Sequence, residues 1–228
     1  MSNLYIVGTP IGNLKDISIR ALEILKSVDL ILCEDTRVTQ KLLNHFGIKA
    51  RTLSYHQHSK LKKVKYILGL LKKGQDIALV SDAGTPGISD PGNKLVEEVV
   101  KFLEDRVKII PIPGPSALIS VASISGFPTD KFLFLGFPPQ KRKRKKFFQE
   151  VINSKYPVVL YESPYRILKT LKEISIINNK LSVVVCRELT KKFETTYRGI
   201  IEQVIAKIKN PEVGDKIKGE FVLIISSK

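Results

Sequence analysis

The chain has 228 residues, enough for one large domain or two small ones, and 43% of them are hydrophobic, which is enough for a core. Its net charge of +16 favours a polyanionic partner, nucleic acid before an anionic membrane, although a general bias toward lysine would also produce it. No apolar run reaches the length of a membrane span and no signal region precedes the first strand, so we expect a cytoplasmic protein.

The two cysteines, Cys33 and Cys186, lie far apart in the sequence, and each follows an apolar run. Two buried free thiols suit a reducing compartment. A structural zinc site needs four clustered ligands, and the three His residues cannot complete one at this spacing. We therefore expect no metal.

The first half of the chain alternates short apolar runs with segments of helical periodicity. We predict strands at 4–7, 30–33, 77–80 and 107–110, and helices at 17–28, from a cap at Thr36 to Phe46, from a cap at Ser59 to Gly74, and from residue 93. Repeated strand–helix alternation indicates a parallel sheet that is covered by helices.

A proline-rich segment, Pro111–Pro115, is the predicted domain boundary and divides the chain into residues 1–113 and 114–228. Beyond it, Ser116 is expected to cap a helix that runs to Ser125, and Ser163 one that begins at Pro164. Further strands are predicted at 132–135, 158–161, 181–186, 194–198 and 221–225, with a helix at 200–208.

Three loops rich in glycine and proline follow predicted strands, at residues 8–12, 81–92 and 113–116. Open α/β sheets bind ligands at the carboxyl ends of their strands, and glycines allow the backbone to approach a ligand closely. The loops lack Gly-x-Gly-x-x-Gly and a Walker-type lysine, so a nucleoside with few charges fits better than a phosphate-rich nucleotide. The alternative is that they only connect elements.

Two charged clusters are candidates for chemistry. Asp35, after the second strand, could accept a proton and Arg37 could hold a phosphate, or the two could form a helix cap with an ion pair. The run 141–146 is entirely basic and opens an amphipathic helix, where cations oppose the helix dipole, so a phosphate backbone is the expected ligand. A solvated charge run and a membrane-surface patch are the alternatives. Possible base-stacking residues are Tyr55, His56 and His58.

The sequence also resembles the ribosomal RNA small-subunit methyltransferase I family of the tetrapyrrole methylase superfamily. The resemblance spans nearly the whole chain and rests on the motifs Thr9–Leu14, Glu34–Arg37, Ser81–Pro86, Asp90–Gly92, Pro113–Ala117, Gly136–Pro138, Tyr161–Arg166 and Cys186–Lys191. It implies two α/β domains with S-adenosylmethionine in a cleft between them, usually as a homodimer. It also implies 2′-O-methylation of a cytidine ribose in the decoding region of 16S ribosomal RNA, in the free RNA or the assembled small subunit.

By the same resemblance, a set of loop residues is expected to bind the cofactor: Pro10, Ser81, Asp82, Gly84, Thr85, Ile88, Ser116, Ala117, Tyr161 and Leu189. The tetrapyrrole branch usually has Gly-Asp-Pro where this chain has Gly84-Thr85-Pro86, which speaks against a small corrin-type substrate. A methylase of a small molecule and a non-catalytic RNA-binding protein are the alternative functions.

In-line methyl transfer depends mainly on positioning, helped by a carboxylate that takes the proton of the ribose hydroxyl. The candidate catalytic residues are Asp35 with Arg37, Glu162 and Glu188. The candidate RNA-binding residues are the cations of the basic run and two further arginines: Lys141, Arg142, Lys143, Arg144, Lys145, Lys146, Arg166 and Arg187.

Overall fold

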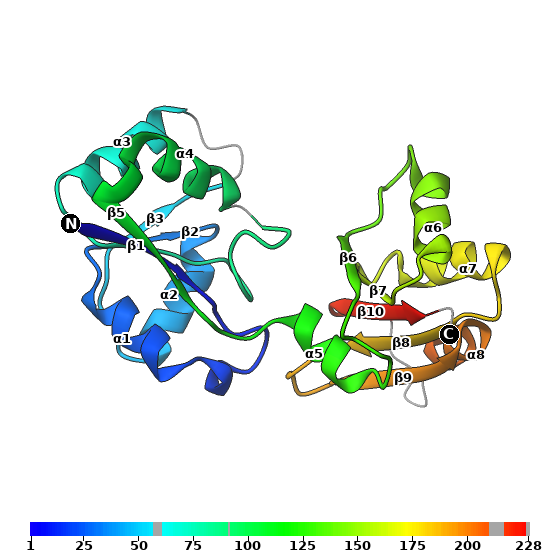
Figure 1. Cartoon of the computed structure of the whole chain (residues 1–228). Coiled ribbons are helices and arrows are strands. Elements are labelled where there is room, and N and C mark those ends of the chain that lie inside the picture. The colour runs from blue at the N-terminus through cyan, green and yellow to red at the C-terminus, as the bar shows by residue number, and fades with distance from the viewer. Residues whose placement is uncertain (57–60, 91, 210–216, 227–228) are drawn as a thin grey trace. The chain divides into compact units, whose positions relative to one another are not determined.

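The computed structural model describes residues 1–56, 61–90, 92–209 and 217–226. The chain divides into two compact units, residues 1–116 (unit 1) and 117–228 (unit 2) (Figure 1). The division falls three residues after the position expected from the sequence. None of the helices in the described ranges is long and apolar enough to cross a membrane.

Unit 1 is built on a parallel sheet with the strand order β3-β2-β4-β1-β5. Its strands are β1 (Ser2–Val7), β2 (Leu30–Cys33), β3 (Thr52–Ser54), β4 (Ile77–Leu79) and β5 (Val107–Ile112). All five carboxyl ends therefore lie at one edge of the sheet. The connections from β1 and β4 lead in opposite directions along the sheet, so this edge contains a topological switch point, the usual ligand site of an open α/β fold.

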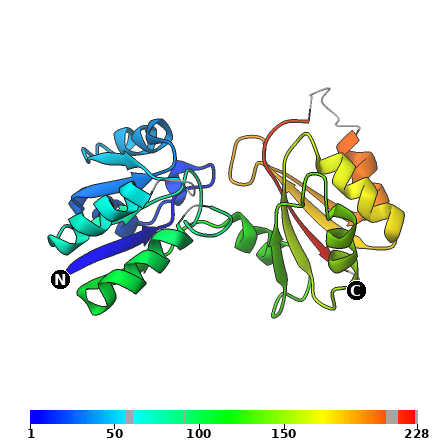
Figure 2. The same cartoon turned by 90° about the horizontal axis from the view of Figure 1, so that it is seen from above.

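Helices cover both faces of this sheet (Figure 2). They are α1 (Ile19–Ser27), α2 (Thr36–His45), α3 (Leu61–Lys72) and α4 (Asn93–Leu103), with short 3-10 turns η1 (Leu14–Asp16) and η2 (Glu104–Arg106). Because successive strand residues face opposite sides, Leu30 and Leu32 pack with α3 and α4, whereas Ile31 and Cys33 pack with α1 and α2. The covered parallel sheet predicted from the sequence is confirmed.

Several local predictions for unit 1 need correction. Asp35, and not Thr36, caps α2, and its carboxylate accepts the N–H of Arg37. Strand β5 continues through Pro111, which an edge strand tolerates because the missing N–H need not join the ladder. Strand β3 was not predicted, because three residues are too few for a periodic signal. The proposed cap Ser59 lies outside the described residues.

Unit 2 contains a mixed sheet with the order β6-β7-β10-β8-β9. Its strands are β6 (Leu133–Gly136), β7 (Val158–Glu162), β8 (Ser182–Arg187), β9 (Thr195–Ile200) and β10 (Phe221–Ser226). Strand β10 is antiparallel to both β7 and β8, and β6 is parallel to β7. The carboxyl ends of β6, β7 and β8 therefore lie at the same edge.

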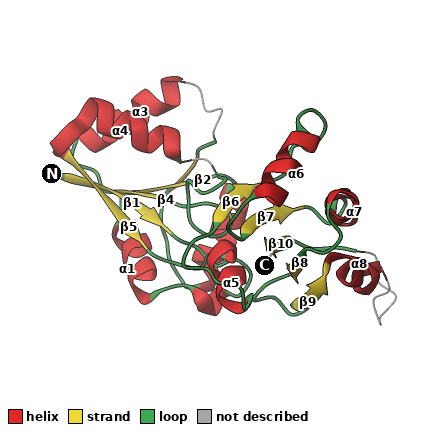
Figure 3. Ribbon diagram, turned by 45° about the vertical axis from the view of Figure 1, so that its right-hand side comes forward, coloured by secondary structure: helices red, strands yellow, loops and turns green. Residues whose placement is uncertain are grey.

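Helices α6 (Arg144–Asn153), α7 (Ile167–Ile177) and α8 (Ile201–Lys209) cover one face of this sheet, and α5 (Ala117–Ile124) covers the other (Figure 3). The apolar runs of β7, β8 and β10 are buried on both faces, as continuous hydrophobic strands should be. Helix α7 begins at Ile167, so Ser163–Arg166 forms a turn before the helix and not its cap and first residues.

Candidate functional site

The loops after β1 and β4 are joined at the carboxyl edge of unit 1. The backbone N–H of Thr9 donates to the carbonyl of Gly84 at 2.9 Å, and the N–H of Gly84 donates to the carbonyl of Thr9 at 3.1 Å. The hydroxyl of Thr9, itself buried, donates to the carbonyl of Ser81 at 3.1 Å. Gly84 has φ +80°, a conformation that glycine adopts without strain.

The loops after β1 and β5 also touch, through backbone alone. A Cβ on Gly8 would lie 2.8 Å from Cα of Gly114, and a Cβ on Gly114 would lie 2.8 Å from the carbonyl oxygen of Gly8. The two loops can approach this closely only because both positions are glycine. The three glycine- and proline-rich loops thus form one continuous structure at the switch point, in which Gly8 and Gly84 are buried and Gly114 is exposed.

The predicted cofactor residues are divided between the two units. Pro10, Ser81, Asp82, Gly84, Thr85 and Ile88 lie on the joined loops of unit 1, and Ser116 is its last residue. The Ser81 hydroxyl donates to carbonyls of its own loop, those of Ala83 at 3.2 Å and Gly84 at 3.3 Å, so it shapes the loop. Ala117, Tyr161 and Leu189 belong to unit 2 and pack against its α5-side core, and their part in cofactor binding stays a prediction.

Asp35 and Arg37 form the cap and ion pair that the sequence left as an alternative. The Asp35 carboxylate accepts the Arg37 backbone N–H at 2.8 Å and its guanidinium at 2.6 Å and 3.0 Å. The Arg37 side chain is otherwise 86% exposed. Hydrogen bonds from Arg37 lower the pKa of Asp35 to about 2. Such an acidic carboxyl is a weak base, which disfavours Asp35 as the proton acceptor.

Glu34 is the residue that the sequence reasoning missed. It directly follows β2 and is half-buried, and its Oε1 atom is buried without a hydrogen-bond partner. Burial, and then the charges of Asp90 and Asp82, raise the pKa of Glu34 to about 7. Its place at a strand end was a signal, but its burial depends on the loop after β4, which the sequence does not place.

Two further carboxylates lie on that loop, and they interact with Glu34. Burial raises the pKa of Asp90 to about 6; the hydrogen bond with Ser81 opposes this shift, and the charge of Asp82 adds to it.

Within the described ranges, no group of three or more His, Cys, Asp or Glu residues could hold a metal ion. The expected independence of metal stays a prediction.

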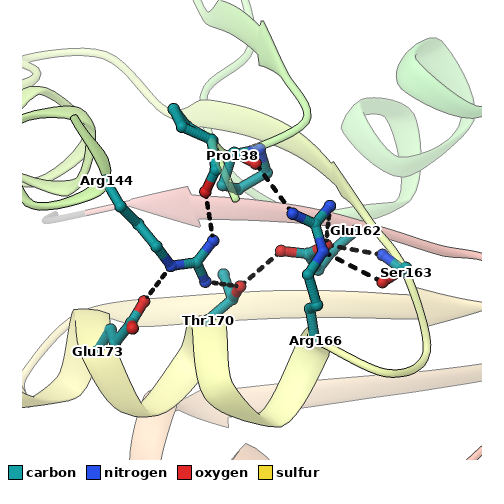
Figure 4. Close-up of polar contacts among 8 residues, drawn as sticks. Pro138, Arg144, Glu162, Ser163, Arg166, Thr170 and Glu173 are labelled. Atoms are coloured by element: carbon teal, nitrogen blue, oxygen red, sulfur yellow. Dashed lines mark hydrogen bonds and ion pairs between the residues drawn. The ribbon is translucent and has the colours of Figure 1, made fainter. Parts of the chain in front are cut away.

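The Glu162 carboxylate has only internal partners, so its expected catalytic role needs correction (Figure 4). The side chain is fully buried. Its oxygens accept the Ser163 N–H at 2.8 Å and the Thr170 hydroxyl at 2.6 Å, and they pair with the Arg166 guanidinium at 2.7 Å. A carboxylate with all these partners stabilises the end of β7 and has no free oxygen for a substrate proton.

Arg144 is likewise internal, and the expectation that it binds RNA is wrong. Figure 4 shows its guanidinium bonded to Glu173 and to the Thr170 hydroxyl, the latter at 2.6 Å. The guanidinium also donates to the Pro139 carbonyl at 2.8 Å. It also lies over the Phe148 ring at 4.8 Å from the centroid. Helical spacing puts Arg144 on the face that packs against α7. The other five cations of the run, at 141–143 and 145–146, are exposed.

The remaining predicted residues of unit 2 also make internal contacts. Arg166 donates to the Pro138 carbonyl at 3.2 Å, and Arg187 donates to the Lys218 carbonyl at 2.7 Å. Glu188 accepts the Glu220 N–H at 2.8 Å and the Lys191 ammonium at 2.9 Å. Burial alone would raise the pKa of Glu188, but these hydrogen bonds lower it, so it is a poor candidate for a neutral-pH base.

Comparison with known proteins first defines the class of protein to which the chain belongs. Residues 3–205 match the family of tetrapyrrole (corrin/porphyrin) methylases. The fold is shared with the solved structure of a cobalt precorrin-4 methyltransferase, at a TM-score of 0.66 and 20% identity, covering 97% of this chain and 94% of that one. A uroporphyrin-III C-methyltransferase from Thermus thermophilus gives 0.65 and 14% identity, covering 98% and 94%. The two-domain α/β fold expected from the sequence is therefore confirmed.

Curated relatives then define the particular family. The chain is 49% identical to "Ribosomal RNA small subunit methyltransferase I" of Hydrogenobaculum sp., over 99% of this chain and 96% of that protein. It is 44% identical to the protein of the same name from Thermotoga maritima, over the full length of both, and 45% identical to that of Escherichia coli O157:H7, over 97% and 77%. The chain belongs to the ribosomal RNA small subunit methyltransferase I family.

Proposed function

We propose that this protein transfers a methyl group from S-adenosylmethionine to the 2′-hydroxyl of a cytidine in the decoding region of small-subunit ribosomal RNA. The family membership supports methylation of this RNA. The observation that carries the chemistry is Glu34, a carboxyl with a pKa near neutrality and an unpartnered oxygen at the ligand edge of unit 1.

The loops of unit 1 fit a cofactor of this kind. Gly114 is exposed at this edge, and Ile88 is an exposed apolar side chain that an adenine ring can cover. Asp82 and Asp90 supply negative charge beside these loops, which suits the sulfonium and amino groups of S-adenosylmethionine. When bound, this cofactor supplies an activated methyl group.

The chain's own contribution is to orient the ribose, exclude water and hold one proton. Glu34 Oε1 lacks a partner and can accept a hydrogen bond from the ribose hydroxyl. A base whose pKa lies near the working pH combines a large ionised fraction with adequate basicity. We therefore assign Glu34 as the acceptor of the ribose hydroxyl proton and Asp35 as the cap of α2.

The alternatives make different predictions. A methylase of a small molecule has no use for the exposed cations of the run 141–146, and a non-catalytic RNA-binding protein has no use for a carboxyl of raised pKa at a ligand edge. Both alternatives are excluded together if the purified protein moves labelled methyl groups from S-adenosylmethionine to small ribosomal subunits.

The assay should use subunits and free ribosomal RNA from a strain without this enzyme, with a chelator present. We expect label in the RNA of at least one substrate and heat of cofactor binding in a calorimetric titration. Cofactor binding without transfer to either RNA would favour a small-molecule methylase. Absence of both would contradict the proposal.

A further inference from the structure

Three loops of unit 2 begin at one edge of its sheet. They are the β6–α6 loop at 137–143, the β7–α7 loop at 163–166 and the β8–β9 loop at 188–194. Phe221 of β10 pairs with Glu162 on one side and with Arg187 on the other, so β7 and β8 end at the same level. Three strand spacings separate β6 from β8, about 14 Å.

Each of these loops presents one aromatic side chain to solvent. Phe137 is 54% exposed, Tyr165 is 94% exposed and Phe193 is 66% exposed. A single exposed apolar side chain needs no explanation, but several gathered at one edge mark an interaction surface. We call the three loops with these side chains the aromatic edge.

The buried network of Figure 4 fixes the first two loops to each other. Arg166 pairs with Glu162 at the end of β7 and donates to the Pro138 carbonyl, next to Phe137 in the chain. Arg144 holds the Pro139 carbonyl at 2.8 Å. The Phe137 ring also packs against Tyr161, with centroids 5.5 Å apart. These contacts fix the backbone of the two loops, so that Phe137 and Tyr165 are held outside the core.

The third loop is also built by internal bonds. The Glu188 N–H donates to the Glu220 carbonyl at 2.9 Å, and the Lys191 N–H donates to the Glu188 carbonyl at 3.0 Å. The Thr195 hydroxyl donates to the carbonyl of Phe193 itself at 3.2 Å. Lys192 Nζ lies 5.5 Å from the centre of the Phe193 ring. A side chain presented by such a loop loses little entropy when it binds.

Charge identifies the kind of partner. The three loops contain six Lys or Arg residues and two Glu. Arg166 is paired with Glu162, and Lys191 with Glu188 and Glu220, so the exposed cations are Lys141, Arg142, Lys143 and Lys192. Cations interleaved with exposed aromatic rings are what single-stranded nucleic acids require, because phosphates meet the cations and unstacked bases cover the rings. A second copy of the chain would bring like charges together, and an RNA duplex offers no open base face.

We propose that the aromatic edge binds an unpaired stretch of RNA, with bases stacked on Phe137, Tyr165 and Phe193. The proposal rests on the function proposed above and deepens it, because it makes the RNA substrate of this enzyme locally single-stranded. The exposed Lys141, Arg142 and Lys143 contact phosphates of the same stretch.

The test measures binding of a 12-nucleotide single-stranded RNA and of an RNA hairpin at several salt concentrations. Each of F137A, Y165A and F193A should weaken single-strand binding by roughly 5- to 100-fold without changing the salt slope, because a stacked base is lost and no charge is. The conservative variants Y165F and F193Y, which keep an aromatic ring, should bind the single strand as the wild type does. Replacing Lys141, Arg142 and Lys143 by Gln should instead flatten the slope by roughly 2.

Phe102 on α4 provides the matched control. It is 53% exposed and has Lys101 Nζ 5.3 Å from its ring centre, much like Phe193 with Lys192, but it lies in unit 1. F102A should bind RNA as the wild type does. Cooperative melting transitions would show that all variants fold: those at Tyr165 and Phe193 should melt as the wild type does, and F137A, which loses its packing against Tyr161, at a slightly lower temperature.

The proposal would be overturned if the wild-type protein did not bind the single strand, or if the alanine variants bound it as well as the wild type does. It would also be overturned if the variants lost self-association while their RNA binding stayed intact. The last result would make the edge an interface between copies. Methyl transfer to small subunits, measured in parallel, separates the two proposals. Single-strand binding without transfer would contradict the function alone, whereas transfer unaffected by the three alanines would contradict the aromatic edge alone.

Discussion

The backbone N–H of Asp35 donates a 3.1 Å hydrogen bond to the carboxylate of Asp82, which ties the loop after β2 to the loop after β4. The bond brings the negative charge of Asp82 close to Glu34, the residue before Asp35. Together with burial and Asp90, that charge keeps the Glu34 carboxyl protonated to a higher pH than usual. The caps and loops of unit 1 thus create a carboxyl whose pKa suits proton transfer near neutrality.

Replacing Glu34 by Gln should lower kcat for methyl transfer by roughly 10²- to 10⁴-fold and leave cofactor affinity nearly unchanged. The wild-type rate should rise with pH and level off above about 7, because the carboxylate must be ionised to accept a proton. Asp35→Asn is the matched control, because Asn still caps α2. If Asp35→Asn loses activity and Glu34→Gln keeps it, the assignment of the proton to Glu34 is wrong.

Protonation of Glu34 should also be visible in stability. Its pKa in the folded protein, about 7, lies above the ordinary 4.5, so the folded state binds more protons than the unfolded state between these values. The stability that it contributes is complete below pH 4.5 and is lost as the pH rises through 7. Urea unfolding should therefore show Glu34→Gln gaining stability over the wild type from pH 5 to pH 8. An equal difference at both pH values would contradict the raised pKa.

Replacing Arg144 by Ala should destabilise the protein by about 3 kcal/mol, because Thr170 and Glu173 lose a buried charged partner. Arg142, two residues earlier and exposed, is the control, and Arg142→Ala should change the free energy of unfolding by less than about 0.5 kcal/mol. Urea unfolding measures both. Equal effects would mean that the network of Figure 4 adds no stability.

Replacing Gly8 by Ala should separate the loops after β1 and β5, because the new Cβ meets the backbone of Gly114 at 2.8 Å. We expect weaker binding of S-adenosylmethionine and a lower melting temperature. Gly69→Ala, inside α3 with open space around the new Cβ, should leave binding intact and raise stability by roughly 0.5–1 kcal/mol. Calorimetric titration of both variants decides whether the glycine contact supports the cofactor site.

The motif resemblance given under the sequence analysis predicts a homodimer. Sedimentation equilibrium should give twice the chain mass of 25.6 kDa. A mass near 25.6 kDa at high protein concentration would rule the dimer out.

The alternation of apolar runs and helical segments was enough to predict four of the five strands of unit 1 and the helices that cover them, because strands buried on both faces leave continuous apolar runs. The site was harder to predict. Glu162 and Arg144 looked like residues of a binding surface. Each is instead paired with an opposite charge from another part of the chain, Arg166 for Glu162 and Glu173 for Arg144, and both hydrogen-bond to Thr170. Glu34 looked like a neighbour of Asp35, but their pKa values have different causes: burial raises that of Glu34, whereas local hydrogen bonds from Arg37 lower that of Asp35.

The most direct test of the central claim identifies the methylated nucleoside. Small subunits from a strain without this enzyme are incubated with the protein and labelled S-adenosylmethionine, and the RNA is digested to nucleosides. The account predicts label in 2′-O-methylcytidine, and its loss with Glu34→Gln. Label in a base-methylated nucleoside, or no label in the RNA, would contradict it.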